Sequence, residues 1–273
     1  MNLFHRILNL LEATMETPTN FGWFHLMFVV IVILTTIFLC VKFRDCDDKI
    51  FRRIALISWI VIVALEIYKQ IIFSYNYDNG VVTWDYQWYA FPYQFCSTPL
   101  FTLPFVIFLK DGKIRDAFIL YMSTFSLFAG LAVFAYPNDV FIDTIGINIQ
   151  TMIHHGLQIV LGIYFAVYSR KKCTLCNFAK SIPVFAGFSL LAILLDISVY
   201  KIFIANGVDE TFNMFYISPY FPCTLPILSM IYERVNYFLF LIMYLIGFVL
   251  VALIVYGIEK LFINLSRREK KNA

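Results

Sequence analysis

Long, continuous runs of apolar residues are the dominant pattern along this chain. A bilayer core about 30 Å thick is crossed by about 20 apolar residues of helix, and the sequence contains several runs of this length. The predicted spans cover residues 21–43, 54–73, 90–109, 114–134, 148–168, 182–204 and 237–258. Apolar residues do not alternate with polar ones, as they would in a β-barrel. The pattern therefore predicts an all-α membrane protein, a bundle of seven transmembrane helices.

Composition supports this interpretation. Hydrophobic residues make up 61% of the 273 positions and charged residues only 14%, against about 25% in ordinary soluble domains. So few charges cannot cover the surface of a soluble domain of this size. The net charge of +3 is small, and the sequence has no basic patch together with a nucleic-acid-recognition motif. We therefore expect no nucleic-acid partner. We expect a multi-pass integral protein of the cell membrane.

Basic residues predict how the chain crosses the membrane. Most of the 21 lysines and arginines lie in the loops around 42–53, 110–116 and 169–181 and in the tail 264–273. By the positive-inside rule these segments are cytoplasmic. We therefore expect the N-terminus outside, with 1–20 as an external segment without a cleavable signal, and the C-terminus inside. Residues 21–263 then form a single transmembrane domain.

The long external connection, residues 206–236, is unusual for a loop. It is apolar and contains Pro219, Pro222 and Pro226. A segment of this composition is better suited to a cap, or to a shallow re-entrant segment over the outer mouth, than to a solvated loop.

Polar side chains inside the predicted spans are the candidates for a site, because ionisable groups in a membrane are costly and face the interior. They include His25, Glu66, Gln94, Cys96, Thr98, Asn148, Thr151, His154, His155, Gln158 and Asp196. At 1.5 Å per residue, Cys96, His155, Glu66 and Asp196 all lie roughly 10 Å below the outer surface. The inner halves of the spans are almost purely apolar, which favours a blind outward cavity over a channel.

The fifth span has a polar stripe. Asn148, Thr151, His155 and Gln158 are spaced by three, four and three residues, so they share one helical face. His154 flanks the same stripe, and periodicity does not choose between the two histidines. A purely structural role is the alternative, in which the histidines bridge helices through hydrogen bonds.

Cys96 is the candidate nucleophile. Pro92 and Pro99 bracket it, and each proline removes a backbone donor and leaves a carbonyl unpaired. A thiol near a histidine ionises, attacks an ester and holds the acyl group as a thioester. The alternatives are a small apolar filler and a disulfide with Cys223, which would silence the nucleophile.

The two membrane carboxylates have structural alternatives. Glu66 pairs most simply with Lys69 or Gln70 on its own helix. Asp196 either orients a histidine or pairs with Lys201 or Lys69.

We expect no metal and no other cofactor. No HExxH or comparable ligand spacing occurs. Cys173 and Cys176 form a single CxxC beside Cys40 and Cys46, and these cysteines are expected to be reduced bystanders rather than zinc ligands.

Three short motifs resemble those of a known family. They are Pro92-Tyr93-Gln94-Phe95-Cys96, His154-His155-Gly156, and Asn213-Met214-Phe215-Tyr216 with Pro219. Their order and spacing are similar to those of the YwaF-like bacterial membrane proteins, over about residues 20–260. The animal relatives of these proteins include a seven-helix acyltransferase that makes polyunsaturated ether phospholipids. The androgen-induced lipid hydrolases, with threonine in place of the cysteine, are more distant relatives.

The resemblance implies roles for individual residues. Cys96 would carry the acyl group, and His155, which matches the His-Gly of the family, would be the base, with His154 secondary. Gln94 stands where the family often has histidine, and Asn213 would belong to the cap over the site.

The predicted depth of Cys96 then bears on the substrate. Acyl-CoA is cytoplasmic, whereas Cys96 and His155 are expected near the outside. We therefore expect membrane phospholipids as acyl donor and a lipid as acceptor, in a CoA-independent transacylase or a lipase-like hydrolase. A solute transporter or ligand-binding receptor with a polar outward pocket, or a structural protein, is the alternative. Transport would tolerate Cys96→Ser and acyl transfer would not.

Overall fold

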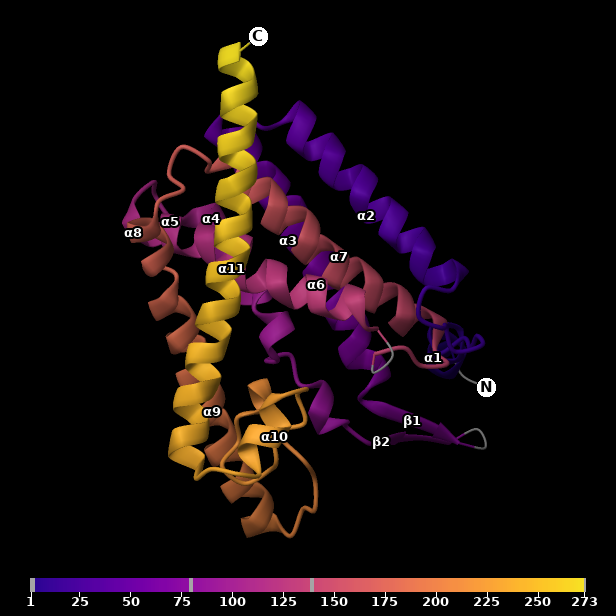
Figure 1. Ribbon diagram of the computed structural model, residues 1–273. Helices are drawn as coiled ribbons and strands as arrows, with labels where there is room; N and C mark the ends of the chain where they lie inside the picture. The colour runs from indigo at the N-terminus through magenta and orange to yellow at the C-terminus, as the bar shows by residue number, and fades with distance from the viewer. Residues whose placement is uncertain (1–2, 79–80, 138–139, 273) are drawn as a thin grey trace.

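The computed structural model describes residues 3–78, 81–137 and 140–272, which form a helical bundle with one small hairpin (Figure 1). The α-helices are α1 (Leu3–Leu11), α2 (Trp23–Lys42), α3 (Asp48–Ile72), α4 (Pro99–Phe108), α5 (Lys113–Tyr121), α6 (Leu127–Ala135), α7 (Ile145–Tyr168), α8 (Leu175–Ala179), α9 (Ile182–Asn206), α10 (Leu228–Tyr232) and α11 (Tyr237–Asn272). Shorter turns are η1 (Trp88–Ala90), η2 (Phe95–Ser97), the π-helical turn η3 (Met122–Ser126) and η4 (Met214–Tyr216). Strands β1 (Tyr75–Asp78) and β2 (Val81–Trp84) pair antiparallel.

Each predicted span contains a helix. In the part of the chain that the structure describes, five helical stretches are long and apolar enough to cross a membrane: α2, α5 through α6, α7, α8 through α9, and α11. A shorter apolar stretch, Phe95–Phe108, falls in the third predicted span, and α3 covers the second. The chain is thus a multi-pass helical membrane protein, and the count of seven spans stays a prediction.

The third span does not begin where the sequence predicted. We expected helix from residue 90, but the backbone between Phe91 and Gln94 is not helical and the helical stretch starts at Phe95. Pro92 lies in this irregular segment, and Pro99 occupies the first turn of α4, where a missing backbone donor costs nothing. Cys96 is therefore the second residue of a helical stretch and not two turns inside a helix.

Helix α7 and the stretch from α5 to α6 are the most buried of the five membrane-length segments. Of the apolar window of each, 72% is buried inside the protein, against 22% for α2 and α11. Helix α6 approaches α7 closely, since a Cβ atom built on Gly130 would lie 2.8 Å from the carbonyl oxygen of His155. Such glycine contacts let backbones meet where lipid provides no hydrophobic driving force.

The three predicted cytoplasmic loops lie at one end of the molecule, where ion pairs join them. Asp48 accepts from Arg52 at 2.6 Å and from Arg115 at 2.7 Å, and Lys172 donates to Asp116 at 2.8 Å. The predicted cap and the β-hairpin lie toward the opposite end (Figure 1). Shared location of the loops is confirmed, whereas the side of the membrane on which they lie stays a prediction.

The β-hairpin and the full length of α11 were not predicted. The hairpin of β1 and β2 follows α3 directly, although Asn79-Gly80 between aromatic and branched residues is a typical hairpin signal. Helix α11 continues to Asn272, so the predicted tail 264–273 begins inside a helix.

Candidate functional site

Cys96 lies where an irregular segment becomes a helix. Gln94 precedes η2, and the 3₁₀ turn of Phe95–Ser97 passes directly into α4. The Cys96 thiol is free and the residue is partly buried. The positive end of a helix dipole stabilises negative charge, and reactive cysteines are commonly placed at such a position.

Two side chains of α7 hold the backbone carbonyl of Cys96. His154 contacts this oxygen through Nε2 at 2.9 Å, and the Gln158 amide donates to the same oxygen. His154 and Gln158 are four residues apart, so they share one face of α7. The face that meets Cys96 therefore joins Gln158 of the predicted stripe to the flanking His154 and leaves out His155, because the contact with η2 fixes the rotation of α7 and periodicity alone does not.

The histidine tautomers follow from their acceptors. A carbonyl oxygen only accepts, so His154 donates through Nε2 to Cys96 and His155 donates through Nδ1 to the Thr151 carbonyl at 2.8 Å. In the neutral rings the other nitrogens, His154 Nδ1 and His155 Nε2, then carry lone pairs. Both are buried without a partner among the described residues. Among the residues that the structure describes, neither His154 nor His155 forms a hydrogen bond with the Cys96 thiol.

A charged group on α3 lies beside this cluster. Glu66 forms an ion pair with Lys69 at 2.8 Å and accepts from the Gln70 amide at 2.7 Å, so both partners proposed for Glu66 contact it. Glu66 and Lys69 interact electrostatically with the Cys96 thiol and with His154. The buried ion pair is therefore part of the surroundings of Cys96.

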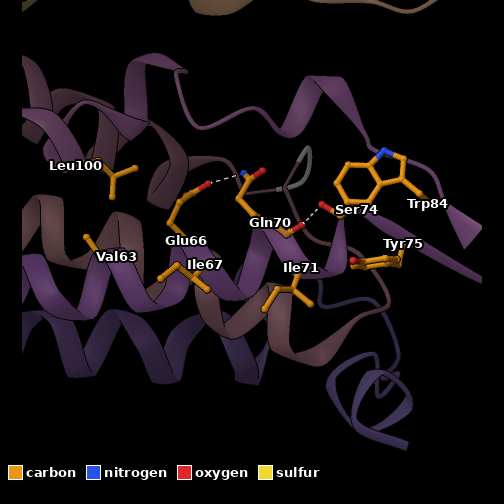
Figure 2. A pocket seen from close by; sticks show the side chains of 9 residues that line it. All are labelled: Val63, Glu66, Ile67, Gln70, Ile71, Ser74, Tyr75, Trp84 and Leu100. Atoms are coloured by element: carbon orange, nitrogen blue, oxygen red, sulfur yellow. Dashed lines mark hydrogen bonds between the residues drawn. The ribbon is translucent and has the colours of Figure 1, made fainter. Parts of the chain in front are cut away.

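A groove of about 400 Å³ runs along α3 beside Glu66 (Figure 2). Its walls are mostly apolar, with Ile67 and Ile71 on α3 and Leu100 on α4. Trp84 of the hairpin closes one end. An apolar groove with a few polar groups is the usual form of a small-molecule site.

The segment around η4 covers the site from the other side. Gln94 donates to the Asn213 carbonyl at 3.1 Å and accepts from the Phe215 amide at 3.0 Å. Asp196, fully buried, accepts from the Met214 amide at 2.7 Å. Neither a histidine nor a lysine contacts Asp196 among the described residues, so both partners proposed for it were wrong.

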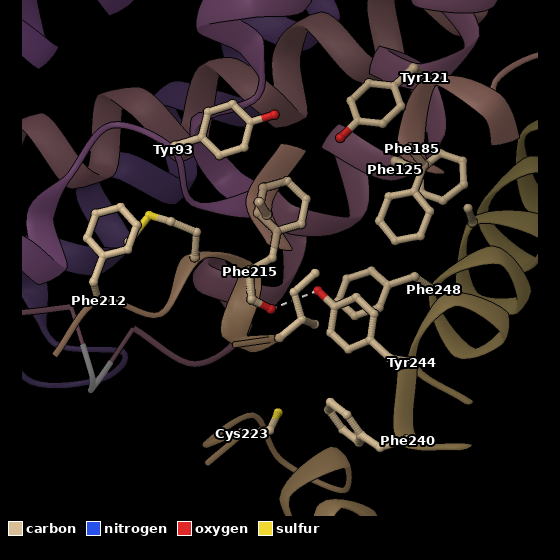
Figure 3. Packing of buried hydrophobic residues seen from close by; sticks show 14 of the residues in the cluster. Tyr93, Tyr121, Phe125, Phe185, Phe212, Phe215, Cys223, Phe240, Tyr244 and Phe248 are labelled. Atoms are coloured by element: carbon tan, nitrogen blue, oxygen red, sulfur yellow. Dashed lines mark hydrogen bonds between the residues drawn. The ribbon is translucent and has the colours of Figure 1, made fainter. Parts of the chain in front are cut away.

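Aromatic packing completes this cover. The ring of Phe215 packs against those of Tyr93 and Phe95. The Tyr244 hydroxyl donates to the Phe215 carbonyl at 2.9 Å (Figure 3). Phe215 and Tyr216 have φ of 58° and 57°, a backbone conformation that costs energy for residues other than glycine and persists only where contacts impose it. We name residues 212–218, which these bonds hold, the cap segment.

The remaining candidates have local structural partners. Thr98 accepts from the Tyr121 hydroxyl at 3.1 Å, and Asn148 pairs with the amide and carbonyl of Ile142 at 2.9 and 2.7 Å. Cys223 is a free thiol, as is Cys96, so they form no disulfide. No group of three or more His, Cys, Asp or Glu side chains suited to a metal occurs among the described residues.

Sequence reasoning missed what Gln94 and Gln158 do. Gln94 was a candidate at a position where the family often has histidine and Gln158 a member of the polar stripe, yet each bonds to the backbone of a segment distant in sequence. A glutamine amide inside a span needs partners for its donor and acceptor, and this requirement was the available signal.

Comparison with known proteins identifies one family. The family model of the TMEM164 family matches residues 20–259 of this chain. No curated protein and no solved structure matches the chain. The matched region contains Cys96, both histidines of α7 and the cap segment.

Proposed function

The chain belongs to the TMEM164 family, and we propose that it is a membrane lipid acyltransferase that carries the acyl group on Cys96. The observation that carries the proposal is the arrangement of a free thiol at the start of a helical stretch, with its own carbonyl held by His154 and Gln158. Such a clamp fixes the position of the residue that would attack. The resemblance of the three motifs to the YwaF-like proteins, whose animal relatives include a seven-helix ether-phospholipid acyltransferase, supports the same chemistry.

His155 is our candidate for the base. Its Nδ1–H donates to a backbone carbonyl, and its Nε2 is buried without a partner among the residues that the structure describes. This is how a base is oriented by a third group in nucleophilic catalysis. His154 uses Nε2 on the Cys96 carbonyl, so it acts as a positioning residue.

The first step would form the acyl-enzyme. The Cys96 sulfur attacks the ester carbonyl of a phospholipid as His155 takes the thiol proton. The ester C–O bond breaks, the leaving glycerol oxygen receives that proton, and a lysophospholipid departs. The acyl group remains on Cys96 as a thioester.

The second step would release the acyl group. The hydroxyl of a lipid acceptor gives its proton to His155 and attacks the thioester, and the thiolate leaves and recovers the proton. Water in place of the lipid would make the protein a hydrolase with the same residues.

The groove beside Glu66 supports access from the membrane. Its apolar walls suit acyl chains, and it opens along α3. We infer that the protein lies in the cell membrane with seven spans, the N-terminus outside and the cap segment on the outer side. A donor at that depth is a membrane phospholipid rather than acyl-CoA.

Mass spectrometry of the Cys96 peptide tests the proposal. Protein incubated with isotope-labelled phosphatidylcholine should gain the labelled acyl mass on Cys96, and hydroxylamine should remove it. Cys96→Ala should gain none and transfer no label, while remaining folded because the change leaves only a small cavity. The matched control Cys40→Ala, another free cysteine, should behave as wild type. Wild-type transfer by folded Cys96→Ala would overturn the acyl-enzyme mechanism. Labelled free fatty acid without labelled lipid product would identify a hydrolase.

A further inference from the structure

A second groove, away from the Cys96 site, lies between α4, α5 and α9. It has a volume of about 640 Å³ and is lined mostly by apolar side chains. Phe105 and Phe118 stack with ring centroids 4.3 Å apart on one wall, and Val184 and Leu191 of α9 form the other.

Two basic residues are among the side chains that line this groove. Lys113 is the first residue of α5 and Lys180 lies just before α9, and both line the groove. Lys180 donates to the Asn177 side chain at 2.5 Å. Among the described residues neither lysine forms an ion pair, because the nearby Asp111 and Asp116 pair with Lys172.

The apolar end reaches into the bundle. From Pro183 to Leu191 the wall of α9 extends about 12 Å along the helix. Tyr93 lines the groove, and its hydroxyl donates to the Phe188 carbonyl at 3.3 Å. Its ring also stacks on Phe215 of the cap segment. Tyr93 therefore separates this groove from the cover of the Cys96 site.

We propose that this groove binds an anionic phospholipid, with the phosphate at Lys113 and Lys180 and an acyl chain along α9. Two cations without a carboxylate partner in the described part of the chain attract a negative headgroup, and basic residues between helices at the cytoplasmic side are suited to anionic lipids. The apolar wall matches a chain and not a soluble anion. This lipid would be bound rather than consumed, since Cys96 is not among the groove residues.

Native mass spectrometry of the purified, delipidated protein tests this. The delipidated protein is incubated with equal amounts of phosphatidylglycerol and phosphatidylcholine that carry identical acyl chains. Wild type should retain phosphatidylglycerol at least about tenfold more than phosphatidylcholine. The double variant Lys113→Ala/Lys180→Ala should lose this preference. Equal retention of the two lipids by wild type would overturn the proposal.

Gly187 offers a steric test with a matched control. It lines the groove and a Cβ there meets no atom within 4 Å, as is also true of Gly247 on α11. Gly187→Phe should fill the groove and abolish retention of phosphatidylglycerol, while Gly247→Phe should retain it. Unchanged retention by Gly187→Phe would place the lipid elsewhere.

Two further arms separate the alternatives. Inorganic phosphate in millimolar excess should not displace the lipid, and displacement would mean that the lysines are a simple anion site. Cys96→Ala should bind phosphatidylglycerol as wild type does, so failure of the acyl-transfer proposal and failure of this one are distinguishable.

Discussion

At the scale of single residues, the two histidines of α7 differ in what they hold. Each has one buried ring nitrogen without a partner among the described residues, but His155 donates to the Thr151 carbonyl, whereas His154 shares the Cys96 carbonyl with Gln158. His155→Ala should lower the single-turnover rate of thioester formation by about 10²–10⁴, the usual contribution of a general base. His154→Ala should cost much less, because Gln158 still holds the carbonyl. Equal losses in the two variants would mean that the base was assigned to the wrong ring or that both act structurally.

At the scale of elements, the cap segment depends on a few buried acceptors. The Met214 amide has Asp196 as its acceptor, and Asp196→Leu would leave this donor buried and unpaired, at a cost of about 1–3 kcal/mol. Asp196→Asn keeps an oxygen in place and should be much milder. Limited proteolysis should therefore cut the cap segment faster in Asp196→Leu than in Asp196→Asn. Equal protection would show that aromatic packing around Phe215, and not this bond, holds the segment.

The sequence predicted elements better than it predicted contacts. Apolar length alone located helical segments, and the bracketing prolines marked Cys96 as unusual. The start of the third helix at Phe95, the π-helical turn Met122–Ser126 and the bonds of Gln94 to the cap segment were not predicted. These features depend on segments far apart in sequence, which a periodicity of 3.6 residues does not relate. For the same reason periodicity does not show which of His154 and His155 contacts the Cys96 backbone, whereas the structure places His154 there.

At the scale of the whole molecule, the ion pairs of Asp48 and Lys172 link the three predicted cytoplasmic loops and make the stability of the fold depend on pH. Partial burial opposes the charge of Asp48, but hydrogen bonds from Arg52 and Arg115 outweigh it and lower its pKa. Partial burial likewise opposes the charge of Lys172, yet Asp116 and Asp111 raise its pKa. The stabilisation from a carboxyl whose pKa is lowered on folding is present above about pH 4 and is lost as the pH falls further. The stabilisation from a lysine whose pKa is raised on folding is present below about pH 10.5 and is lost as the pH rises through the folded pKa. The thermal midpoint should thus be flat from about pH 5 to 9 and fall below about pH 4.

The matched variants for this pH dependence are Asp48→Asn and Asp209→Asn. Asp48 bonds to two arginines, whereas Asp209 is exposed near the opposite end. Asp48→Asn should lower the midpoint at neutral pH and flatten its acid decline, because the titrating carboxylate is gone. Asp209→Asn should leave both unchanged. An acid decline as steep in Asp48→Asn as in wild type would place its cause in other carboxylates.

The orientation of the whole bundle is the prediction on which the choice of lipid donor depends. Cys176 is an exposed native thiol at the start of α8, in the loop region predicted to be cytoplasmic. In intact cells a membrane-impermeant maleimide should leave Cys176 unlabelled, and permeabilisation should expose it. Asp209→Cys, in the exposed segment after α9, should be labelled without permeabilisation, which controls for reagent activity. Peptide mass spectrometry distinguishes the two sites in one protein. Labelling of Cys176 in intact cells would invert the bundle, place Cys96 near the cytoplasm, and make acyl-CoA the donor to test first.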